Sequence, residues 1–178
     1  MPLRTNPGET EQGRTMMKEP ESKPRKLDRV DRRILMHLQR NARLSNKELA
    51  QLVHLSPTPC LRRVALLEQS GVVARYRAVL DHPRLGYTVR AFITIKRTRD
   101  CDRDELWRKI TAIPEILAAH VVSGEFDLLV EMIAHDMDHY STLLLETINK
   151  LAGVYDSRTL FCVKELKTNG DVPITEIA

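Results

Sequence analysis

Two helix-start signals lie so close together in this sequence that only a very tight turn fits between the helices they open. Residues 45–48 read Ser-Asn-Lys-Glu, a capping box whose serine and glutamate side chains each accept a bond from the other's backbone N–H. Residues 56–57 read Ser-Pro, where serine can cap a helix and proline takes the first position, which needs no donor. Only His54 and Leu55 remain for the turn. This spacing predicts a helix-turn-helix.

A further amphipathic helix is predicted before this pair, and a terminator follows it. Asp28 can cap the first helix, and Gly71 stands where the third helix should end. The helical domain is therefore predicted over residues 27–71. The side chains expected to face its core are Val30, Ile34, Leu35, Leu38, Leu49, Leu52, Val53, Leu61, Val64 and Leu67.

Beyond residue 71 the apolar pattern changes to the alternation typical of β-strands. Residues 72–80 predict a strand, and a loop signal follows, so residues 72–87 are expected to link two domains. Residues 88–166 then give the order βαββαβ, which is the ferredoxin-like pattern. The predicted fold class is α+β, with an N-terminal helix-turn-helix (winged-helix-like) domain and a C-terminal ferredoxin-like domain. Helices cover one face of such a sheet, and a second copy can cover the other, so we expect a homodimer.

Basic residues are concentrated in one part of the chain. The formal net charge is +4, but residues 28–80 carry a clear basic excess and residues 81–178 are net acidic. Residues 1–26 predict a disordered basic tail, and residues 167–178 a C-terminal tail. The asymmetry favours double-stranded DNA as a partner of the helical domain, although a solvated basic face would give the same count.

The residues suited to DNA lie near the starts of the second and third helices and in the predicted linker strand. Arginine can bind guanine edges or phosphates, and the sequence leaves both roles open for each arginine. Ordinary solvated side chains are the alternative. The candidates are Asn46, Lys47, Ser56, Thr58, Arg62, Arg63, Arg75 and Arg77.

Other chemistry finds little support in the residues. Cys60, Cys101 and Cys162 are far apart, so neither a disulfide framework nor a zinc site is expected. His135 and His139 have a spacing that can present two imidazoles to a metal, but such residues more often cap a helix and face water, so no metal is expected. We find no paired catalytic groups and expect no enzyme and no cofactor. Without a signal peptide or a membrane span, a cytoplasmic protein associated with the nucleoid is expected.

Three segments together resemble the Lrp/AsnC (leucine-responsive regulatory protein) family. They are residues 27–35, LDRVDRRIL, residues 55–60, LSPTPC, and residues 122–127, VSGEFD. The resemblance spans about residues 27–168. It implies a DNA-binding helix-turn-helix, an amino-acid-binding domain that dimerises, and assembly beyond the dimer to a tetramer or octamer. One position departs from the family, which usually has glycine where this chain has His54. Histidine tolerates positive φ, so the motif is expected to survive with some strain.

An effector site is expected at the third of these segments. Gly124 would let a ligand approach the backbone, and Asp127 could accept from an α-ammonium group. Backbone amides of Ser123, Gly124 and Glu125 could hold an α-carboxylate. The alternative is an ordinary turn followed by a solvated carboxylate, and the family resemblance favours the functional interpretation.

Three functions fit these residues to different degrees. The first is a sequence-specific transcription regulator whose DNA binding or assembly is modulated by a small amino acid at the dimer interface. The second is a broad-specificity, nucleoid-associated DNA-organising protein without an effector. The third is a small enzyme with an accessory helix-turn-helix, which the absence of paired catalytic groups disfavours.

Overall fold

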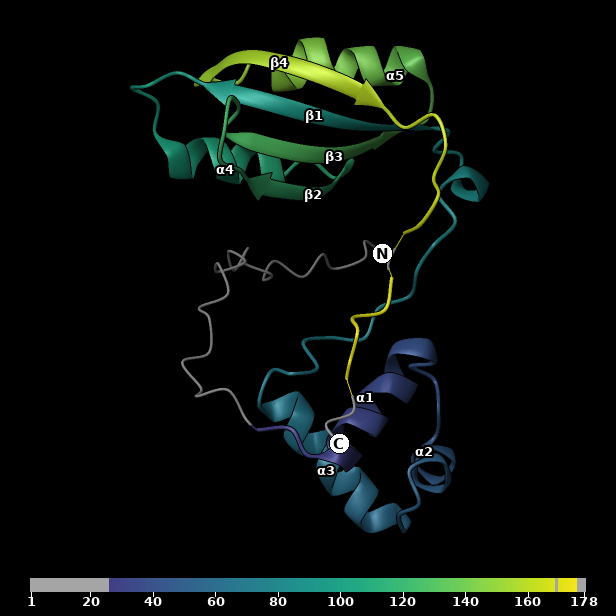
Figure 1. Cartoon of the computed structure of the whole chain (residues 1–178). Coiled ribbons are helices and arrows are strands. Elements are labelled where there is room, and N and C mark those ends of the chain that lie inside the picture. The colour runs from purple at the N-terminus through teal and green to yellow at the C-terminus, as the bar shows by residue number, and fades with distance from the viewer. Residues whose placement is uncertain (1–25, 169, 176–178) are drawn as a thin grey trace, which may run out of the picture. The chain divides into compact units, whose positions relative to one another are not determined.

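The computed structural model describes residues 26–168 and 170–175, in two compact units (Figure 1). Of the described residues, the helical unit comprises 26–77 together with 171–175, and the sheet unit comprises 78–168 and 170. The predicted basic tail, apart from Lys26, lies outside the described residues.

The helical unit contains the three predicted helices, α1 (Arg29–Arg40), α2 (Asn46–Leu52) and α3 (Pro57–Gln69). Asp28 caps α1 and Ser45 caps α2, each within a complete capping box. Ser56 is the N-cap residue of α3, but its side chain makes no capping hydrogen bond, contrary to the prediction. Pro57 occupies the first position of α3 as expected. The tight pair of helices is thus confirmed.

The turn between α2 and α3 requires a left-handed backbone. His54 has φ of 57° and is the one non-glycine with positive φ among the described residues. Histidine adopts this conformation at a cost that glycine does not have, because glycine has no Cβ to meet the following carbonyl. The expected strain is therefore present at His54.

Replacing His54 by glycine is expected to stabilise the helical unit. We expect His54→Gly to raise the free energy of unfolding by about 0.5–1 kcal/mol, since the left-handed cost is removed. Urea-induced unfolding would measure the change. His54→Val is the matched control and should lower stability, because a β-branched side chain tolerates positive φ poorly. Equal stability of the two variants would contradict the assignment of strain to this residue.

The buried stripe of α3 contains Val64 and Leu67 as predicted, but Cys60 takes the place expected for Leu61. Cys60 and Leu67 are fully buried, with Val64 partly buried beside them, whereas Leu61 is 58% exposed. One residue along a helix turns the side chain by about 100°, so a stripe that starts at Cys60 leaves Leu61 outside. Leu52 of α2 was also expected inside and is 41% exposed.

The sheet unit confirms the βαββαβ order. Its elements are β1 (Val89–Arg97), α4 (Arg103–Thr111), β2 (Ile116–Val121), β3 (Leu128–Ala134), α5 (Met137–Thr142) and β4 (Val154–Phe161). A short helix, η1 (Pro83–Leu85), precedes β1, and α5 continues as a π-helical stretch, η2 (Leu143–Ile148). The strands are antiparallel in the order β2-β3-β1-β4. The last strand ends before residue 166, where the sequence pattern had placed its end.

The segment 72–80 forms no strand in the structure, contrary to the prediction. Its side chains do not alternate between buried and exposed, since the neighbours Val79 and Leu80 are 66% and 59% exposed. A strand needs a neighbouring strand to satisfy the hydrogen bonds of its backbone N–H and C=O groups. Among the described residues, no strand pairs with this segment. The alternation alone did not reveal that the partner is missing.

The two faces of the sheet differ sharply. On one face, Ala91, Ile93 and Ile95 of β1 are fully buried in a core with residues of α4, α5 and η2 (Figure 1). On the other face, Phe92 pairs across strands with Leu160, which is 62% exposed. No helix of the described chain covers this second face, which we call the uncovered face. Among the described residues no helix is long and apolar enough to cross a membrane.

Candidate nucleic-acid interface and ligand site

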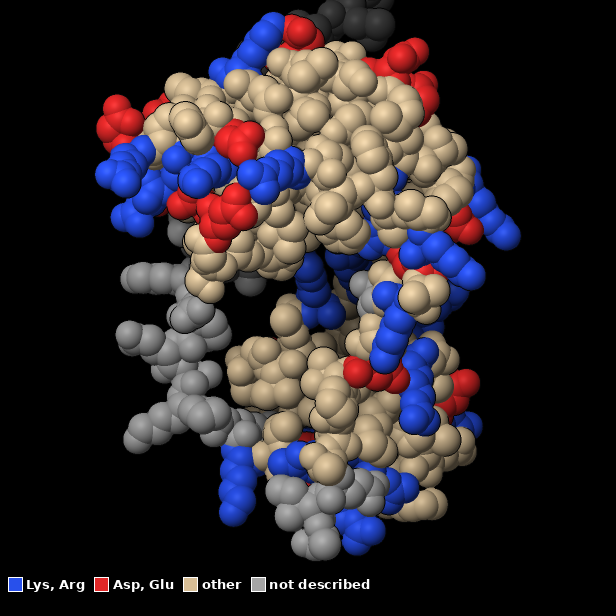
Figure 2. Space-filling view, turned by 45° about the horizontal axis from the view of Figure 1, so that its top comes forward, with Lys and Arg blue, Asp and Glu red and all other residues tan. Residues whose placement is uncertain are grey.

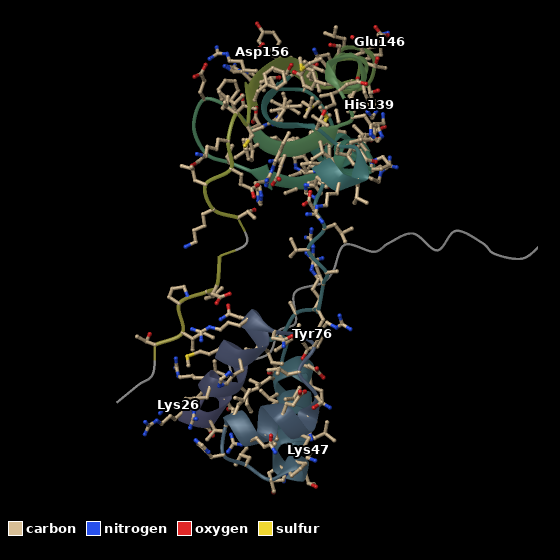
Figure 3. The ribbon with its side chains drawn as sticks, turned by 90° about the vertical axis from the view of Figure 1, so that its right-hand side faces the viewer. Lys26, Lys47, Tyr76, His139, Glu146 and Asp156 are labelled. Atoms are coloured by element: carbon tan, nitrogen blue, oxygen red, sulfur yellow. The ribbon has the colours of Figure 1, made fainter. Side chains whose placement is uncertain are left out.

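Four of the predicted DNA-binding side chains are exposed around the start of α3. Lys47 lies at the start of α2 (Figure 3), and Ser56, Thr58 and Arg62 lie at the start and on the outer face of α3. Among the described residues, neither Lys47 nor Arg62 forms an ion pair, and the Ser56 side chain makes no capping hydrogen bond. Figure 2 shows further Lys and Arg side chains on the surface of the helical unit. This surface can offer cationic and hydroxyl donors to phosphates or base edges.

Asn46 has a partner inside the protein. Its Nδ2 donates to the carbonyl oxygen of Pro57 at 2.8 Å, and its Oδ1 is buried without a hydrogen-bond partner. The side chain therefore ties the start of α2 to the first turn of α3. This position favours a role in fixing the angle between the two helices over a contact with phosphate.

Arg63 is also held within the helical unit. Its Nη1 lies 2.6 Å from Oδ2 of Asp28 and 2.8 Å from Oδ1 of Asp31, whose side chain is 1% exposed. The hydrogen bonds that Arg63 donates to the Asp28 and Asp31 carboxylates raise the pKa of its guanidinium. Burial raises the pKa of Asp28, but the backbone N–H of Asp31 and the Arg63 guanidinium outweigh it, so the Asp28 pKa lies below its ordinary value. These bonds join α3 to the start of α1, which favours a structural role for Arg63.

Arg75 and Arg77 are exposed in the segment 72–80 rather than paired on a strand face. Between them, Tyr76 donates from its hydroxyl to Oε1 of Glu68 at 2.8 Å, next to the end of α3 (Figure 3). Burial, together with the Glu68 carboxylate, raises the pKa of Tyr76 to about 12. Tyr76 therefore stays neutral at physiological pH and fixes the path of the chain that carries both arginines.

The predicted effector turn is open and its carboxylates are already engaged. Gly124 has φ of 124°, and a side chain placed there would meet no atom within 4 Å. Asp127 accepts from the backbone N–H of Arg97 at 2.9 Å and pairs with its Nε at 3.2 Å. Glu125 pairs with Arg158 at 3.1 Å. Ser123 lies in the same turn. An α-ammonium group would have to share Asp127 with Arg97.

A pocket of about 320 Å³ lies beside this turn. It adds groups that sequence reasoning missed, namely Arg103, Asp104 and Trp107 of α4 and Arg97 at the end of β1. Asp127 and Val122 complete the side of the pocket next to the turn. Opposite charges and an aromatic surface thus come together from three separate parts of the sheet unit. Such a set suits a zwitterion with an apolar side chain.

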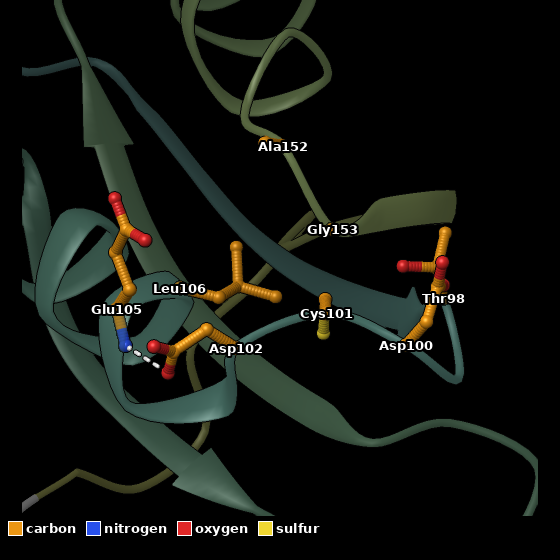
Figure 4. A pocket seen from close by; sticks show the side chains of 8 residues that line it. All are labelled: Thr98, Asp100, Cys101, Asp102, Glu105, Leu106, Ala152 and Gly153. Atoms are coloured by element: carbon orange, nitrogen blue, oxygen red, sulfur yellow. Dashed lines mark hydrogen bonds between the residues drawn. The ribbon is translucent and has the colours of Figure 1, made fainter.

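A second pocket of about 240 Å³ has a different character (Figure 4). Its lining contains Asp100, Asp102 and Glu105 but no lysine or arginine, and Asp102 caps α4 by accepting from the backbone N–H of Glu105. Without a cation, this pocket is poorly suited to an α-carboxylate. The pocket beside the 122–127 turn is therefore the better candidate for an amino-acid site.

The two histidines considered for a metal are engaged with each other and with the loop before β1. The His135 ring stacks between Tyr87, at 4.2 Å between centroids, and His139, at 5.1 Å. Nδ1 of His135 lies 3.0 Å from the Gly86 carbonyl oxygen, and Nδ1 of His139 accepts from the His135 backbone N–H. Their geometry is that of a packed ring stack at the start of α5.

A helix-turn-helix with exposed polar groups, joined to an antiparallel α+β unit with a zwitterion-sized pocket, defines a two-domain transcription regulator with a ligand-binding domain. Profiles of a winged helix-turn-helix DNA-binding domain and of the Lrp/AsnC ligand binding domain match residues 27–74 and 88–172. The chain belongs to the Lrp/AsnC family. It is a DNA-binding transcription regulator of that type.

The similarity to characterised members covers most of the chain. The leucine-responsive regulatory proteins of Escherichia coli and Salmonella typhimurium are 39% identical over 150 residues, 83% of this chain and 92% of theirs. A transcriptional regulator from Neisseria meningitidis, solved as a complex with L-Met, has a TM-score of 0.81 and 36% identity, covering 83% of this chain and 97% of its own. An AsnC family regulator from Agrobacterium tumefaciens has a TM-score of 0.77 and 29% identity over the same shares.

Proposed function

We propose that a small amino acid, bound in the sheet unit, modulates the sequence-specific DNA binding or the assembly of this regulator. The observation that carries the proposal is the mixed-charge pocket beside the 122–127 turn. Arg97 or Arg103 can bind an α-carboxylate, Asp104 or Asp127 an α-ammonium group, and Trp107 an apolar side chain. The L-Met complex of the Neisseria meningitidis regulator supports an amino acid as the ligand class.

The test uses Trp107, which is the single tryptophan of the chain and lines the pocket. Each of the twenty amino acids is titrated into the full-length protein while tryptophan fluorescence is recorded. Fluorescence anisotropy then measures affinity for DNA from upstream of the protein's own gene, with random DNA as competitor. We expect one or a few amino acids to change both signals over the same concentration range.

Two variants on α4 sharpen this test. Arg103→Ala removes a pocket cation and should weaken the amino-acid response about tenfold or more, whereas Arg108→Ala removes an exposed cation on the same helix outside the pocket. An equal effect of the two variants would contradict the pocket assignment. Equal affinity for random DNA, without any amino-acid effect, would instead favour a nucleoid-associated DNA-organising protein.

We further propose that the protein is a homodimer in which a second copy of the chain packs against the uncovered face. Leu160 and its cross-strand neighbour Phe92 give that face an apolar centre, and Arg90 forms ion pairs there with Glu131 and Glu165. An apolar centre with charged groups around it is the usual make-up of an interface between copies. Assembly to a tetramer or octamer remains a prediction.

Arg62 is proposed as a direct DNA contact, together with Lys47, Ser56 and Thr58. Arg62→Ala is expected to weaken binding to the specific DNA about tenfold, because one charge-assisted contact is lost. Anisotropy titrations at several salt concentrations would measure the affinity and its salt slope. Arg84→Ala removes an equal charge from the sheet unit, where Arg84 pairs with Asp81, and serves as the control. Equal losses in both variants would contradict the contact.

A further inference from the structure

The last described residues of the chain return to the helical unit. Asp171 to Thr175 belong to the same compact unit as α1, and Figure 1 shows this yellow segment reaching α1. The sequence predicted only a C-terminal tail here. The structure gives the segment a defined place.

The segment is bound mainly through its backbone. The Val172 N–H donates to Oε1 of Gln39 at 2.7 Å, and Nε2 of the same glutamine donates to the Val172 carbonyl oxygen at 3.2 Å. Arg32 Nη1 donates to the Thr175 carbonyl oxygen at 3.1 Å. The amide of Gln39 thus offers Val172 the donor and acceptor that a neighbouring β-strand would offer. The Val172 side chain itself is 67% exposed.

Apolar contact adds to these hydrogen bonds. Ile174 packs against the core of the helical unit, and it lines a groove of about 530 Å³ together with Leu35, Leu38 and Val73. An exposed ion pair between Arg40 and Asp171 at 3.9 Å lies at the start of the segment and contributes little. A partly buried isoleucine flanked by backbone hydrogen bonds is a specific docking arrangement for an extended chain.

We propose that this groove beside α1 is the docking site of residues 171–175 of the same chain, and that the docked segment is a second connection to the DNA-binding helices. The first connection is the segment that follows α3 and leads into the sheet unit. The second connection is the segment that follows β4. Both ends of the sheet unit's sequence are therefore joined covalently to the helical unit. A tether at each end restricts the orientations of a domain more than one tether does. Ligand-dependent changes in the sheet unit then reach α1 as well as α3, a consequence that rests on the proposed function.

Hydrogen–deuterium exchange, resolved to single amides by mass spectrometry, tests the contact itself. We expect the Val172 amide of the full-length protein to exchange at least about tenfold more slowly than in an unstructured peptide. Gln39→Met removes the acceptor and should return this amide to the unstructured rate. Exchange of the wild-type amide at the unstructured rate would overturn the proposal.

The same measurement on a monomeric variant identifies the chain that supplies the segment. Leu160→Asp places a charge on the uncovered face and is designed to separate the two copies. Protection of the Val172 amide that persists in this variant supports docking within one chain. Protection that disappears on separation would assign the segment to a second copy and overturn the proposal.

Two matched variants at position 172 test whether the second connection transmits the effect of the bound amino acid to the DNA-binding helices. Val172→Pro removes the N–H donor, whereas Val172→Ala changes only the exposed side chain. We expect Val172→Pro to reduce the amino-acid-dependent change in DNA affinity several-fold, and Val172→Ala to leave it as in the wild type. A full-sized response in Val172→Pro, with protection of the segment lost, would overturn the coupling role. Absence of any amino-acid response in the wild type would count against the proposed function alone, because the exchange experiment still decides the contact.

Discussion

Asp31→Ala is expected to unfold the helical unit at temperatures where the wild type remains folded. The Asp31 carboxylate is 1% exposed and accepts from Arg63 at 2.8 Å, and it completes the capping box at the start of α1. Removing the Asp31 carboxylate leaves Arg63 paired with Asp28 alone, whose side chain is exposed. It also leaves a small void. Breaking a buried ion pair on one side costs about 3–5 kcal/mol, and the partial exposure of Arg63 reduces this to about 2–4 kcal/mol. For a domain of this size the melting temperature should fall by about 10–20 °C.

Thermal unfolding followed by circular dichroism would measure this loss, with Asp28→Ala as the control. The Asp28 side chain is 51% exposed, so its removal should cost only about 1 kcal/mol, the usual contribution of an N-cap. Similar small losses in both variants would show that the network between α1 and α3 is not the main support of this unit. Binding of specific DNA should fall in parallel with unfolding in Asp31→Ala and recover on cooling.

Leu160→Asp is expected to convert the proposed dimer to a monomer at micromolar concentration. Leu160 lies on the uncovered face, where the described chain leaves it 62% exposed. In a symmetric dimer the substitution removes two apolar groups from the interface and adds two like charges. Each leucine contributes about 1.5–3 kcal/mol when buried, so the dimer dissociation constant should rise by at least about two orders of magnitude.

Analytical ultracentrifugation over a range of concentrations would measure this constant. Leu145→Asp is the matched control, because Leu145 is 55% exposed in η2, on the helical side of the sheet. The monomer of Leu160→Asp should keep its secondary structure, since this leucine packs little within one chain. Dissociation by Leu145→Asp instead, with Leu160→Asp still dimeric, would place the interface on the helices.

The elements that depend on local signals could be predicted from the sequence. Capping residues and apolar periods near Asp28 and Ser45 identify the first two helices, and alternation over residues 88–166 identifies the βαββαβ order. These signals lie within a few residues of each other, so a single sequence is enough to recognise them.

The features that the sequence did not reveal depend on contacts between distant residues. Arg63 stands next to Arg62 and shares its chemistry, yet it turns toward Asp28 and Asp31, more than thirty positions earlier in the chain. The ligand pocket likewise joins the end of β1, the start of α4 and the turn before β3. Local periodicity gives the face of a helix only approximately, and one step of rotation decides which arginine is exposed.

The helical unit is built from segments that precede and follow the sheet unit in the sequence, and this affects how the protein is made. During synthesis α1, α2 and α3 leave the ribosome first and can fold as soon as they emerge. Gln39 meets Val172 only after the whole sheet unit has been translated. The DNA-binding helices can therefore form early, but the groove beside α1 stays open to solvent until the sheet unit has been translated. A nascent chain stalled within the sheet unit would carry formed helices that lack their final stabilising segment.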